Sequence, residues 1–328
     1  MQYPSNKRKK IYIFRMNKVI LITGGCGFIA SNFILYLLDN TDYHIVNIDK
    51  MNYCSRTLDI KLVQDQSRYT FYKCDINNTE FVSFILEHHN VNIVYHFAAQ
   101  THVDNSFDDP NIFVQDNILG TCNLLYVCHK YNLNGRLDKF IHVSTDEVRG
   151  SFSDGYNPTN PYSASKASAE LMAKSYLMSF KLPVIITRSN NVYGAGQYEE
   201  KVIPKFIKML KQGKKCPVYG TGQSKRTYLY ILDACKGYHL ILEKGLVGQI
   251  YEMGTTDEFT TLELLTILEN TFNLNESLSL GDSVDDKCEF VADRLYHDAR
   301  YQVNTKSMLA LGWQPEISFK EGIKKLFI

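Results

Sequence analysis

The 328-residue chain has no dominant charge of one sign, and only one short basic run. Its 36 lysines and arginines nearly balance 35 aspartates and glutamates, which gives a formal net charge of +1. A nucleic-acid-binding protein usually carries a basic excess or a basic stripe, whereas the basic residues here cluster only in NKRKK at 6–10. We therefore expect no nucleic-acid partner, and we interpret residues 1–16 as a flexible N-terminal tail.

Long apolar runs and paired cysteines are also missing. No apolar run approaches the ~20 residues that a membrane-spanning helix needs, and IYIF at 11–14 is too short for the core of a signal peptide. We therefore expect a cytoplasmic protein with no membrane partner. The eight cysteines are scattered singly, with no CxxC pair and no histidine at zinc-binding spacing, so we predict reduced thiols and no metal.

Instead, the chain alternates from residue 18 between short β-branched runs and longer stretches with helical apolar spacing. This repetition predicts an α/β fold, namely a doubly wound (Rossmann) parallel sheet with a smaller, mixed α/β substrate-binding lobe. We place the Rossmann domain at 17–195 and the lobe at 196–328, with the two interleaved. The expected strands are 19–23, 44–49, 69–75, 91–99, 139–144, 183–189 and 249–254, and the expected helices 28–40, 79–89, 110–131, 202–212, 231–243, 260–271 and 304–311.

The turn after the first predicted strand is rich in glycine. In ITGGCGFIAS at 22–31, Gly24, Gly27 and Ala30 form a G-x-x-G-x-x-A pattern. The glycines permit a tight turn and let a pyrophosphate approach the N-terminus of the next helix, where amides and the helix dipole favour an anion. Many strand–helix turns carry glycine for packing alone, but the acidic residues that follow favour a dinucleotide site.

Those acidic residues end the second and third predicted strands. Asp49 stands where a carboxylate accepts the ribose hydroxyls of a dinucleotide, and its charge would repel the extra phosphate of NADP. Lys50 would soften that preference, and Asp75 with Ile76 would reach the adenine. The cofactor predicted from this pattern is NAD.

A second group of residues suggests proton chemistry. The strand KFIHV leads into Thr145, Asp146 and Glu147, although carboxylates are rarely buried without a partner. Tyr162 and Lys166 are four residues apart, so they share one face of the following helix. There the lysine would lower the pKa of the phenol and make it a base. The alternative interpretations are that the Asp146–Glu147 pair is an ordinary solvated turn, and that the small residues of the following helix serve only for close packing.

Together, TGGCGFIAS, Asp49, HFAAQTHVD, STDEV, YSASK and SNNVYG resemble the extended short-chain dehydrogenase/reductase family, and more narrowly the nucleotide-sugar 4,6-dehydratases. The resemblance runs from about residue 17 to the C-terminus. It implies an NAD-dependent hydro-lyase that forms a homodimer. Most of these motifs mark only the superfamily, whereas the Asp146–Glu147 pair is typical of the dehydratases.

The resemblance also assigns roles to individual residues. Tyr162, with Lys166, would take the proton of the carbon 4 hydroxyl, and Thr145 would bond that oxygen. Glu147 would remove the proton from carbon 5, and Asp146 would protonate the hydroxyl that leaves carbon 6. Further cofactor contacts are expected from Phe28, Ile29, Asn52, Phe97, Ala98, Ala99, Asp116 and Asn191, and substrate contacts from Thr101, Asn190, Lys201, Val202, Pro217, Tyr219, Arg226, Arg294 and His297.

Several details favour UDP-glucose over dTDP-glucose as the substrate. DKMNYCS, Ala30, HFAAQTHVDNSF and RTYLY resemble the dehydratase part of plant-type rhamnose synthases, and so imply rhamnose biosynthesis. One departure is Arg149, which stands where the family has tyrosine and would either lower the pKa of Asp146 or point to solvent. The alternatives are a dTDP-glucose dehydratase, a UDP-sugar 4-epimerase or decarboxylase, and a catalytically silent NAD-binding protein.

Overall fold

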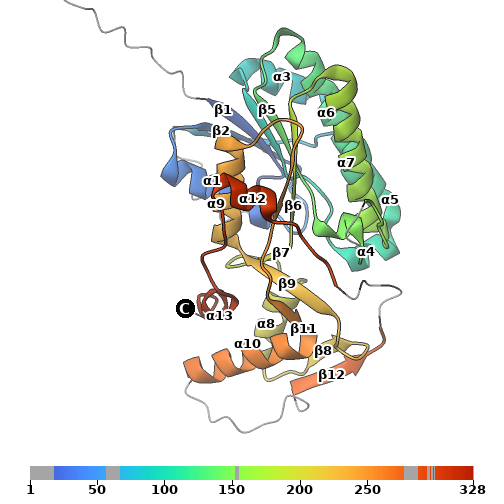
Figure 1. The fold of residues 1–328 in the computed structure, drawn as a ribbon, viewed down its shortest axis with the longest axis vertical. Coiled ribbons are helices and arrows are strands. Elements are labelled where there is room, and N and C mark those ends of the chain that lie inside the picture. The colour runs from blue at the N-terminus through green and yellow to red at the C-terminus, as the bar shows by residue number, and fades with distance from the viewer. Residues whose placement is uncertain are drawn as a thin grey trace, which may run out of the picture.

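The computed structural model describes residues 18–56, 67–151, 155–276, 287–293, 296, 298 and 300–327. The predicted N-terminal tail lies outside these residues. The chain forms a large sheet covered by helices, with a smaller lobe beneath it (Figure 1).

The large sheet contains seven strands, all parallel, in the order β10-β6-β5-β4-β1-β2-β3. Apart from the edge strand β3, its strands are almost wholly buried, because helices cover both faces of a parallel sheet. From β1 the chain adds β2 and β3 on one side, and it then returns to add β4, β5, β6 and β10 on the other side. The strand order therefore reverses between β1 and β4, and ligands bind at this point in folds of this type. The strands are β1 Val19–Thr23, β2 His44–Asp49, β3 Tyr69–Lys73, β4 Ile93–His96, β5 Lys139–Val143, β6 Val184–Ser189 and β10 Ile250–Met253.

Alternate side chains along each strand point to opposite faces, and each face has its own apolar core. Ile20 and Ile22 face the helices α1 Phe28–Asn40, α9 Ile231–Lys244 and α12 Lys306–Leu311. Leu21 faces the other core, which is covered by α3 Thr79–His89, α6 Gly120–Tyr131 and α7 Pro161–Phe180. The chain reaches α6 through α4 Val103–Asp108, α5 Pro110–Phe113 and the π-helical segment η1 Val114–Leu119. Two short 3₁₀ turns, η2 Asn132–Asn134 and η3 Asp146–Arg149, flank β5.

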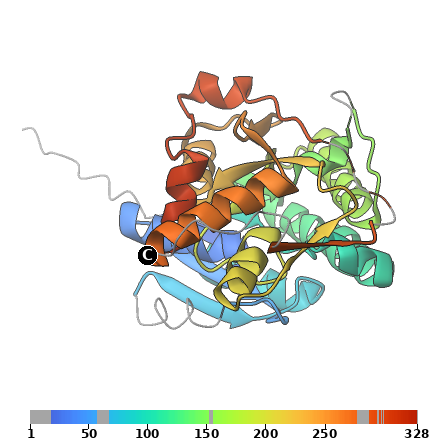
Figure 2. The same ribbon diagram turned by 90° about the horizontal axis from the view of Figure 1, so that it is seen from below.

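The smaller lobe has a third apolar core, which includes Ile203, Phe206 and Leu264. Seen from below, the orange helix α10 and the olive-yellow helix α8 lie side by side there (Figure 2). The lobe contains a three-stranded sheet, β11-β9-β7, and a two-stranded sheet, β12-β8. Its elements are β7 Asn191–Tyr193, α8 Val202–Lys211, β8 Cys216–Tyr219, β9 Lys225–Tyr230, β11 Glu258–Thr260, α10 Thr261–Glu276, β12 Cys288–Val291 and α13 Phe319–Lys324.

The predicted fold class is confirmed, and the predicted strands and helices match the observed ones within a few residues at most ends. The second half of the chain contributes to both parts of the molecule: β10 pairs with β6 in the large sheet, and α9 packs on α1. The lobes are therefore interleaved, and the division at residue 195 stays a prediction.

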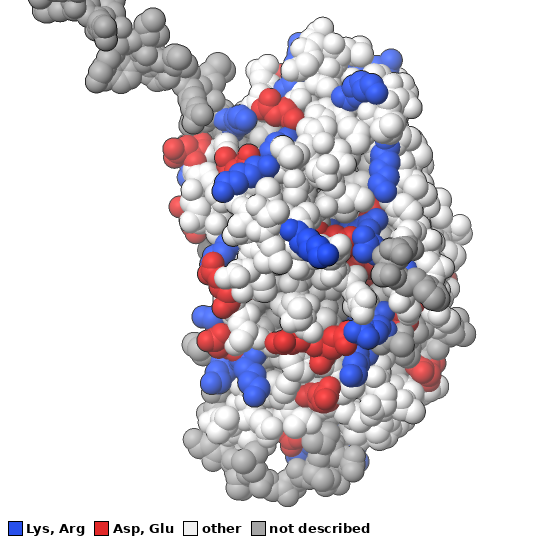
Figure 3. Space-filling model, in the orientation of Figure 1, with Lys and Arg blue, Asp and Glu red and all other residues white. Residues whose placement is uncertain are grey.

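The surface in view carries both signs of charge, interspersed (Figure 3). Within the part of the chain that the structure describes, no helix is both long enough and apolar enough to span a membrane.

Candidate active site

A cavity of about 770 Å³ opens at the carboxyl ends of the large sheet's strands, next to the point where the strand order reverses. Its lining comes from the ends of β1, β2, β4 and β5, from the start of α7, and from α8 and β9 of the smaller lobe. Segments far apart in the sequence therefore meet around one space, whose volume is in the range of small-molecule sites.

The glycine turn forms one wall of this cavity. Gly24 has φ +69°, and a Cβ atom there would lie 2.6 Å from the Cα of Ala98, so only glycine fits the turn. Gly27 is the N-cap of α1, whose first turn has no acidic residue. The free amides of this helix start face the turn and suit a pyrophosphate.

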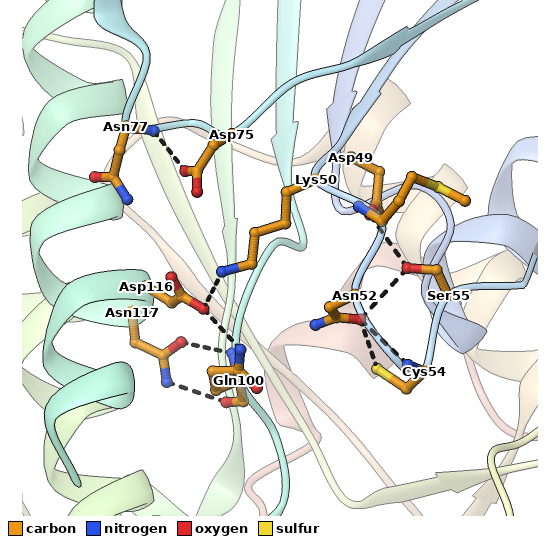
Figure 4. Close-up of polar contacts among 11 residues, drawn as sticks. Asp49, Lys50, Asn52, Cys54, Ser55, Asp75, Asn77, Gln100, Asp116 and Asn117 are labelled. Carbon is orange, nitrogen blue, oxygen red and sulfur yellow. Dashed lines mark hydrogen bonds and ion pairs between the residues drawn. The ribbon is translucent and has the colours of Figure 1, made fainter. Parts of the chain in front are cut away.

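The Asp49 carboxylate is held by donors from the chain. Its Oδ2 accepts from the backbone N–H of Cys26 at 3.0 Å, and its Oδ1 accepts from the backbone N–H of Met51 at 2.7 Å. Oδ1 also accepts from the Ser55 hydroxyl at 3.3 Å (Figure 4). It is 8% exposed and lines the cavity. An anchored acceptor at the end of β2 fits the ribose of a dinucleotide and disfavours a further phosphate.

Lys50 points away from Asp49. Its ammonium forms an ion pair with Asp116 of η1, and the same carboxylate oxygen accepts from the Gln100 side chain at 2.7 Å (Figure 4). Asn117 then fixes Gln100 through two hydrogen bonds, of 2.7 and 3.0 Å, to its backbone. Lys50 was expected to weaken the preference for NAD over NADP. Because Asp116 neutralises its ammonium, this geometry does not support that expectation.

On the opposite wall, β5 ends in a tight acidic turn. Thr145 caps η3, and its hydroxyl accepts from the Glu147 N–H at 3.3 Å and donates to Asp146 Oδ1 at 3.1 Å. Asn190 donates to the other oxygen of Asp146 at 2.9 Å. Thr145, Glu147 and Asn190 line the cavity, whereas Asp146 is only 4% exposed and is not part of the lining.

The two carboxyl groups differ in their electrostatic surroundings. Burial, reinforced by the charge of Glu147, raises the pKa of Asp146 from 3.8 to about 7. Burial also raises the pKa of Glu147, but Arg226, Lys201 and a bond with Asn160 oppose the rise. Asn190, Thr145 and Arg226 oppose the rise at Asp146 in turn. Paired acid–base chemistry needs one carboxyl to be neutral while its neighbour is ionised.

Tyr162 lies in the first turn of α7, which begins at Pro161 and is capped by Asn160. Burial, together with the nearby carboxylates, raises the pKa of its phenol, whereas a hydrogen bond with Thr145 lowers it. Lys166 donates to the Val143 carbonyl at 2.7 Å, and burial lowers the pKa of its ammonium to about 8. Lys166 is not among the main influences on the phenol pKa, and the expected lowering of that pKa by Lys166 stays a prediction.

Arg149 neither approaches Asp146 nor points to solvent. Its guanidinium forms an ion pair with Glu252 of β10, which also pairs with Arg188 at 3.1 Å. Arg188 bonds both oxygens of Glu170, at 3.0 and 2.8 Å. The cation that replaces the family tyrosine is therefore part of an ion network behind η3, and both of the expected outcomes for Arg149 were wrong.

The cavity brings together most of the predicted site residues, although their roles stay predictions. Asp146 does not contribute to the lining, and Arg294 and His297 lie outside the described residues. The predicted residues that line the cavity are Gly24, Gly27, Phe28, Ile29, Asp49, Lys50, Asn52, Asp75, Ile76, Phe97, Ala98, Ala99, Thr101, Asp116, Thr145, Glu147, Tyr162, Lys166, Asn190, Asn191, Lys201, Val202, Pro217, Tyr219 and Arg226.

Sequence reasoning missed a contribution from the C-terminal segment. The hydroxyl of Tyr301 lies 3.4 Å from Glu147 and donates to Asp298 at 3.0 Å, and the Arg226 guanidinium lies 4.6 Å from the Tyr301 ring centre. Asp298 also accepts from Thr159 at 2.5 Å. No spacing or motif signals the contacts with Glu147, Thr159 and Arg226, because each joins residues more than 70 positions apart.

Comparison with known proteins gives the same assignment as the motifs. A family model described as GDP-mannose 4,6 dehydratase matches residues 21–326. The chain is 42% identical to a dTDP-D-glucose 4,6-dehydratase of Bos taurus, over 94% of this chain and 87% of that protein. It is 39% identical to a trifunctional UDP-glucose 4,6-dehydratase, epimerase and reductase of Arabidopsis thaliana, over 94% of this chain but 46% of that one.

Solved structures show the same likeness in three dimensions. The dTDP-glucose 4,6-dehydratase DesIV of Streptomyces venezuelae, with NAD bound, has a TM-score of 0.85 and 33% identity, covering 94% of this chain and 95% of its own. A UDP-glucuronic acid 4-epimerase of Bacillus cereus has a TM-score of 0.84 at 28% identity, covering 94% and 98%. The predicted resemblance is thereby confirmed, and fold likeness extends to enzymes with a different reaction.

Proposed function

The chain belongs to the nucleotide-sugar 4,6-dehydratase family, as an NAD-dependent lyase, and we propose that it converts UDP-glucose to UDP-4-keto-6-deoxyglucose and water. One observation carries the proposal: Thr145, Glu147 and Tyr162 meet at one wall of the cavity, and Asp146, whose pKa is raised to about 7, lies in the same turn. These are the acid and base groups that elimination across carbons 5 and 6 requires.

NAD fits the opposite wall, where Gly24, Gly27, Asp49 and the start of α1 would hold it. When bound, it would supply the hydride acceptor for carbon 4 and the hydride donor for carbon 6.

The chain's own residues handle the protons. Tyr162 takes the proton of the carbon 4 hydroxyl, and the resulting ketone makes the hydrogen at carbon 5 acidic. Glu147, partly exposed in the cavity, removes that proton as general base. Asp146, kept neutral by burial, supplies the proton with which the carbon 6 hydroxyl leaves as water. Glu147 then returns a proton to carbon 5.

The nucleotide would lie against the smaller lobe, along Lys201, Val202, Pro217 and Tyr219, with Arg226 near the diphosphate. A guanidinium suits a diphosphate because its fork bonds two oxygens at once. UDP and dTDP differ in the base by one methyl group, which discriminates by only about 1–3 kcal/mol in an apolar pocket. We favour UDP on the sequence details given above, and dTDP-glucose is the second candidate.

The remaining alternatives have less support. A UDP-sugar 4-epimerase or decarboxylase shares this fold but has no use for the Asp146–Glu147 pair. A silent NAD-binding protein has no use for Tyr162 and Lys166 either. A homodimer, a cytoplasmic location and a place in rhamnose biosynthesis stay predictions.

The test is to incubate the purified protein separately with UDP-glucose and dTDP-glucose in deuterated water and to follow the products by NMR and mass spectrometry. A 4-keto-6-deoxy sugar with deuterium at carbon 5 is expected, formed faster from UDP-glucose. UDP-galactose as product would mean an epimerase. Stable NAD binding without turnover of any nucleotide hexose would mean a silent protein.

A further inference from the structure

Charged side chains gather at the end of the cavity where the adenosine of NAD would lie. The carboxylates of Asp49, Asp75 and Asp116 and the ammonium of Lys50 all belong to the lining there (Figure 4). NADP differs from NAD by a phosphate on the adenosine ribose. Whether this end of the cavity accepts that phosphate depends on how the four charges are arranged.

The Lys50 ammonium is paired with Asp116 and not with its neighbour in sequence. It lies 2.5 Å from Asp116 Oδ2, although the two residues are 66 positions apart. The Asp49 carboxylate instead accepts from the backbone N–H groups of Cys26 and Met51. The end of β2 therefore presents an uncompensated carboxylate to the ribose, while the cation that follows it is neutralised from η1.

A chain of hydrogen bonds holds Asp116 in this position. Its Oδ2 also accepts from the Gln100 side chain at 2.7 Å (Figure 4). The backbone of Gln100 forms two hydrogen bonds with Asn117, and Asn117 donates to the Ser165 hydroxyl of α7 at 2.8 Å. Asp116 and Asn117 lie in the π-helical segment η1, and such segments are frequent at functional sites. The Asp116 carboxylate is therefore fixed relative to both β4 and α7.

A purely structural role would leave this ion pair with little to do. The side chains of Lys50 and Asp116 are 33% and 13% exposed, and a partly exposed pair typically adds only about 0–1 kcal/mol to stability. Both side chains line the cavity, so they face whatever binds there. The larger consequence of the pair is its effect on the charge that a ligand meets.

We propose that Asp116 is a specificity-determining residue, which excludes NADP by neutralising Lys50. The extra phosphate of NADP would meet the Asp49 carboxylate, and an unpaired ammonium on the next residue would offset that repulsion. In NADP-binding members of this fold a nearby arginine accommodates the phosphate. Here Asp116 already occupies the cation that could serve this purpose. The inference concerns the cofactor and does not depend on which nucleotide sugar is the substrate.

Separate binding of NAD and NADP tests the proposal without any turnover. Titration calorimetry on protein freed of bound nucleotide gives a Kd for each, and the ratio of the two Kd values measures selectivity. In the nearly isosteric Asp116→Asn, we expect the selectivity for NAD over NADP to fall at least ~10-fold, because Lys50 then faces the phosphate with its full charge. Adding Lys50→Met to this variant removes both charges of the pair, so the wild-type selectivity should return.

The control is Asp257→Asn, which removes an exposed carboxylate outside the cavity lining and should leave the ratio unchanged. An unchanged ratio in Asp116→Asn would overturn the proposal and show that Asp49 excludes NADP without help. Equal weakening of NAD and NADP would mean that Asp116 only shapes the pocket. Relaxed selectivity that persists in the double variant would rule out Lys50 as the cation. If the wild type turns over no nucleotide hexose, the proposed function fails, and these binding ratios still decide the role of Asp116.

Discussion

At the residue scale, Asp146 is a carboxyl whose folded environment opposes its charge. Burial raises its pKa from 3.8 to about 7, so its contribution to stability is fully present below about pH 4 and is lost as the pH rises through 7. We predict that Asp146→Asn, which stays neutral, increases the free energy of unfolding by roughly 1–3 kcal/mol at pH 8 and by less at pH 5. Chemical denaturation at both pH values measures this. The exposed Asp257→Asn is the control, and a gain that does not grow with pH would contradict the prediction.

The same variant should lose its role as acid. We expect Asp146→Asn to slow water loss by about 10²–10⁴-fold and to slow the oxidation at carbon 4 less, because the amide cannot donate a titratable proton. Rapid-quench mass spectrometry with UDP-glucose separates the two steps. Dehydration at the wild-type rate would remove Asp146 as the acid.

Glu147 should show the complementary pattern. Glu147→Gln keeps the side-chain shape but removes the base, so bound NAD should still be reduced transiently while deuterium exchange at carbon 5 stops. Absorbance of the reduced cofactor and NMR of the recovered sugar measure the two events. Undiminished exchange at carbon 5 would refute the assignment of Glu147 as the base.

At the element scale, the ion network ties the catalytic turn η3 to strand β10. Glu252 accepts from Arg188, Arg149 and the backbone N–H of Asn304. Removing its charge would leave the partly buried Arg149 beside the buried Arg188 without the carboxylate that they share, so we expect Glu252→Gln to lower the free energy of unfolding by about 3 kcal/mol. Arg149→Met should lower the free energy of unfolding by less, since Glu252 keeps Arg188 as a partner.

Urea denaturation of both variants tests this ordering, with the exposed Glu289→Gln as the control. A change below about 0.5 kcal/mol in Glu252→Gln, which is typical of surface substitutions, would show that the network does not stabilise the fold.

At the scale of the whole molecule, the cavity lies between the large sheet and the smaller lobe, so a bound nucleotide contacts both. A ligand at 100 times its Kd stabilises the folded state by about 2.7 kcal/mol. We predict that UDP raises the melting temperature more than dTDP at equal concentration. We also predict that Arg226→Gln weakens the affinity for both nucleotides by about 10-fold or more, and so reduces both increases in melting temperature. Arg136→Gln, which is exposed and remote from the cavity lining, should change neither. Greater stabilisation by dTDP would overturn the preference for UDP.

Local patterns predicted the large sheet well, because each of its strands is a short apolar run between turn residues. The predicted strands 19–23 and 44–49 match β1 and β2 at both ends. The strands β11 and β12 and the helix α13 were not predicted, since they are short and are stabilised by packing against distant segments. The side chain of Tyr301 reaches Glu147 from 154 residues away, and no local pattern encodes that approach.

The sequence by itself determined which chemical groups are present and which ones are adjacent: a glycine turn before a helix, Asp49 after a strand, and Thr145, Asp146, Glu147, Tyr162 and Lys166 at fixed spacing. These features follow from backbone geometry over a few residues. Only the tertiary structure decided that Asp146 is buried, that Asn190 donates to it, and that Arg149 pairs with Glu252. The reason is physical: burial and ion pairing depend on which distant segments pack together, and they in turn set the pKa of each group.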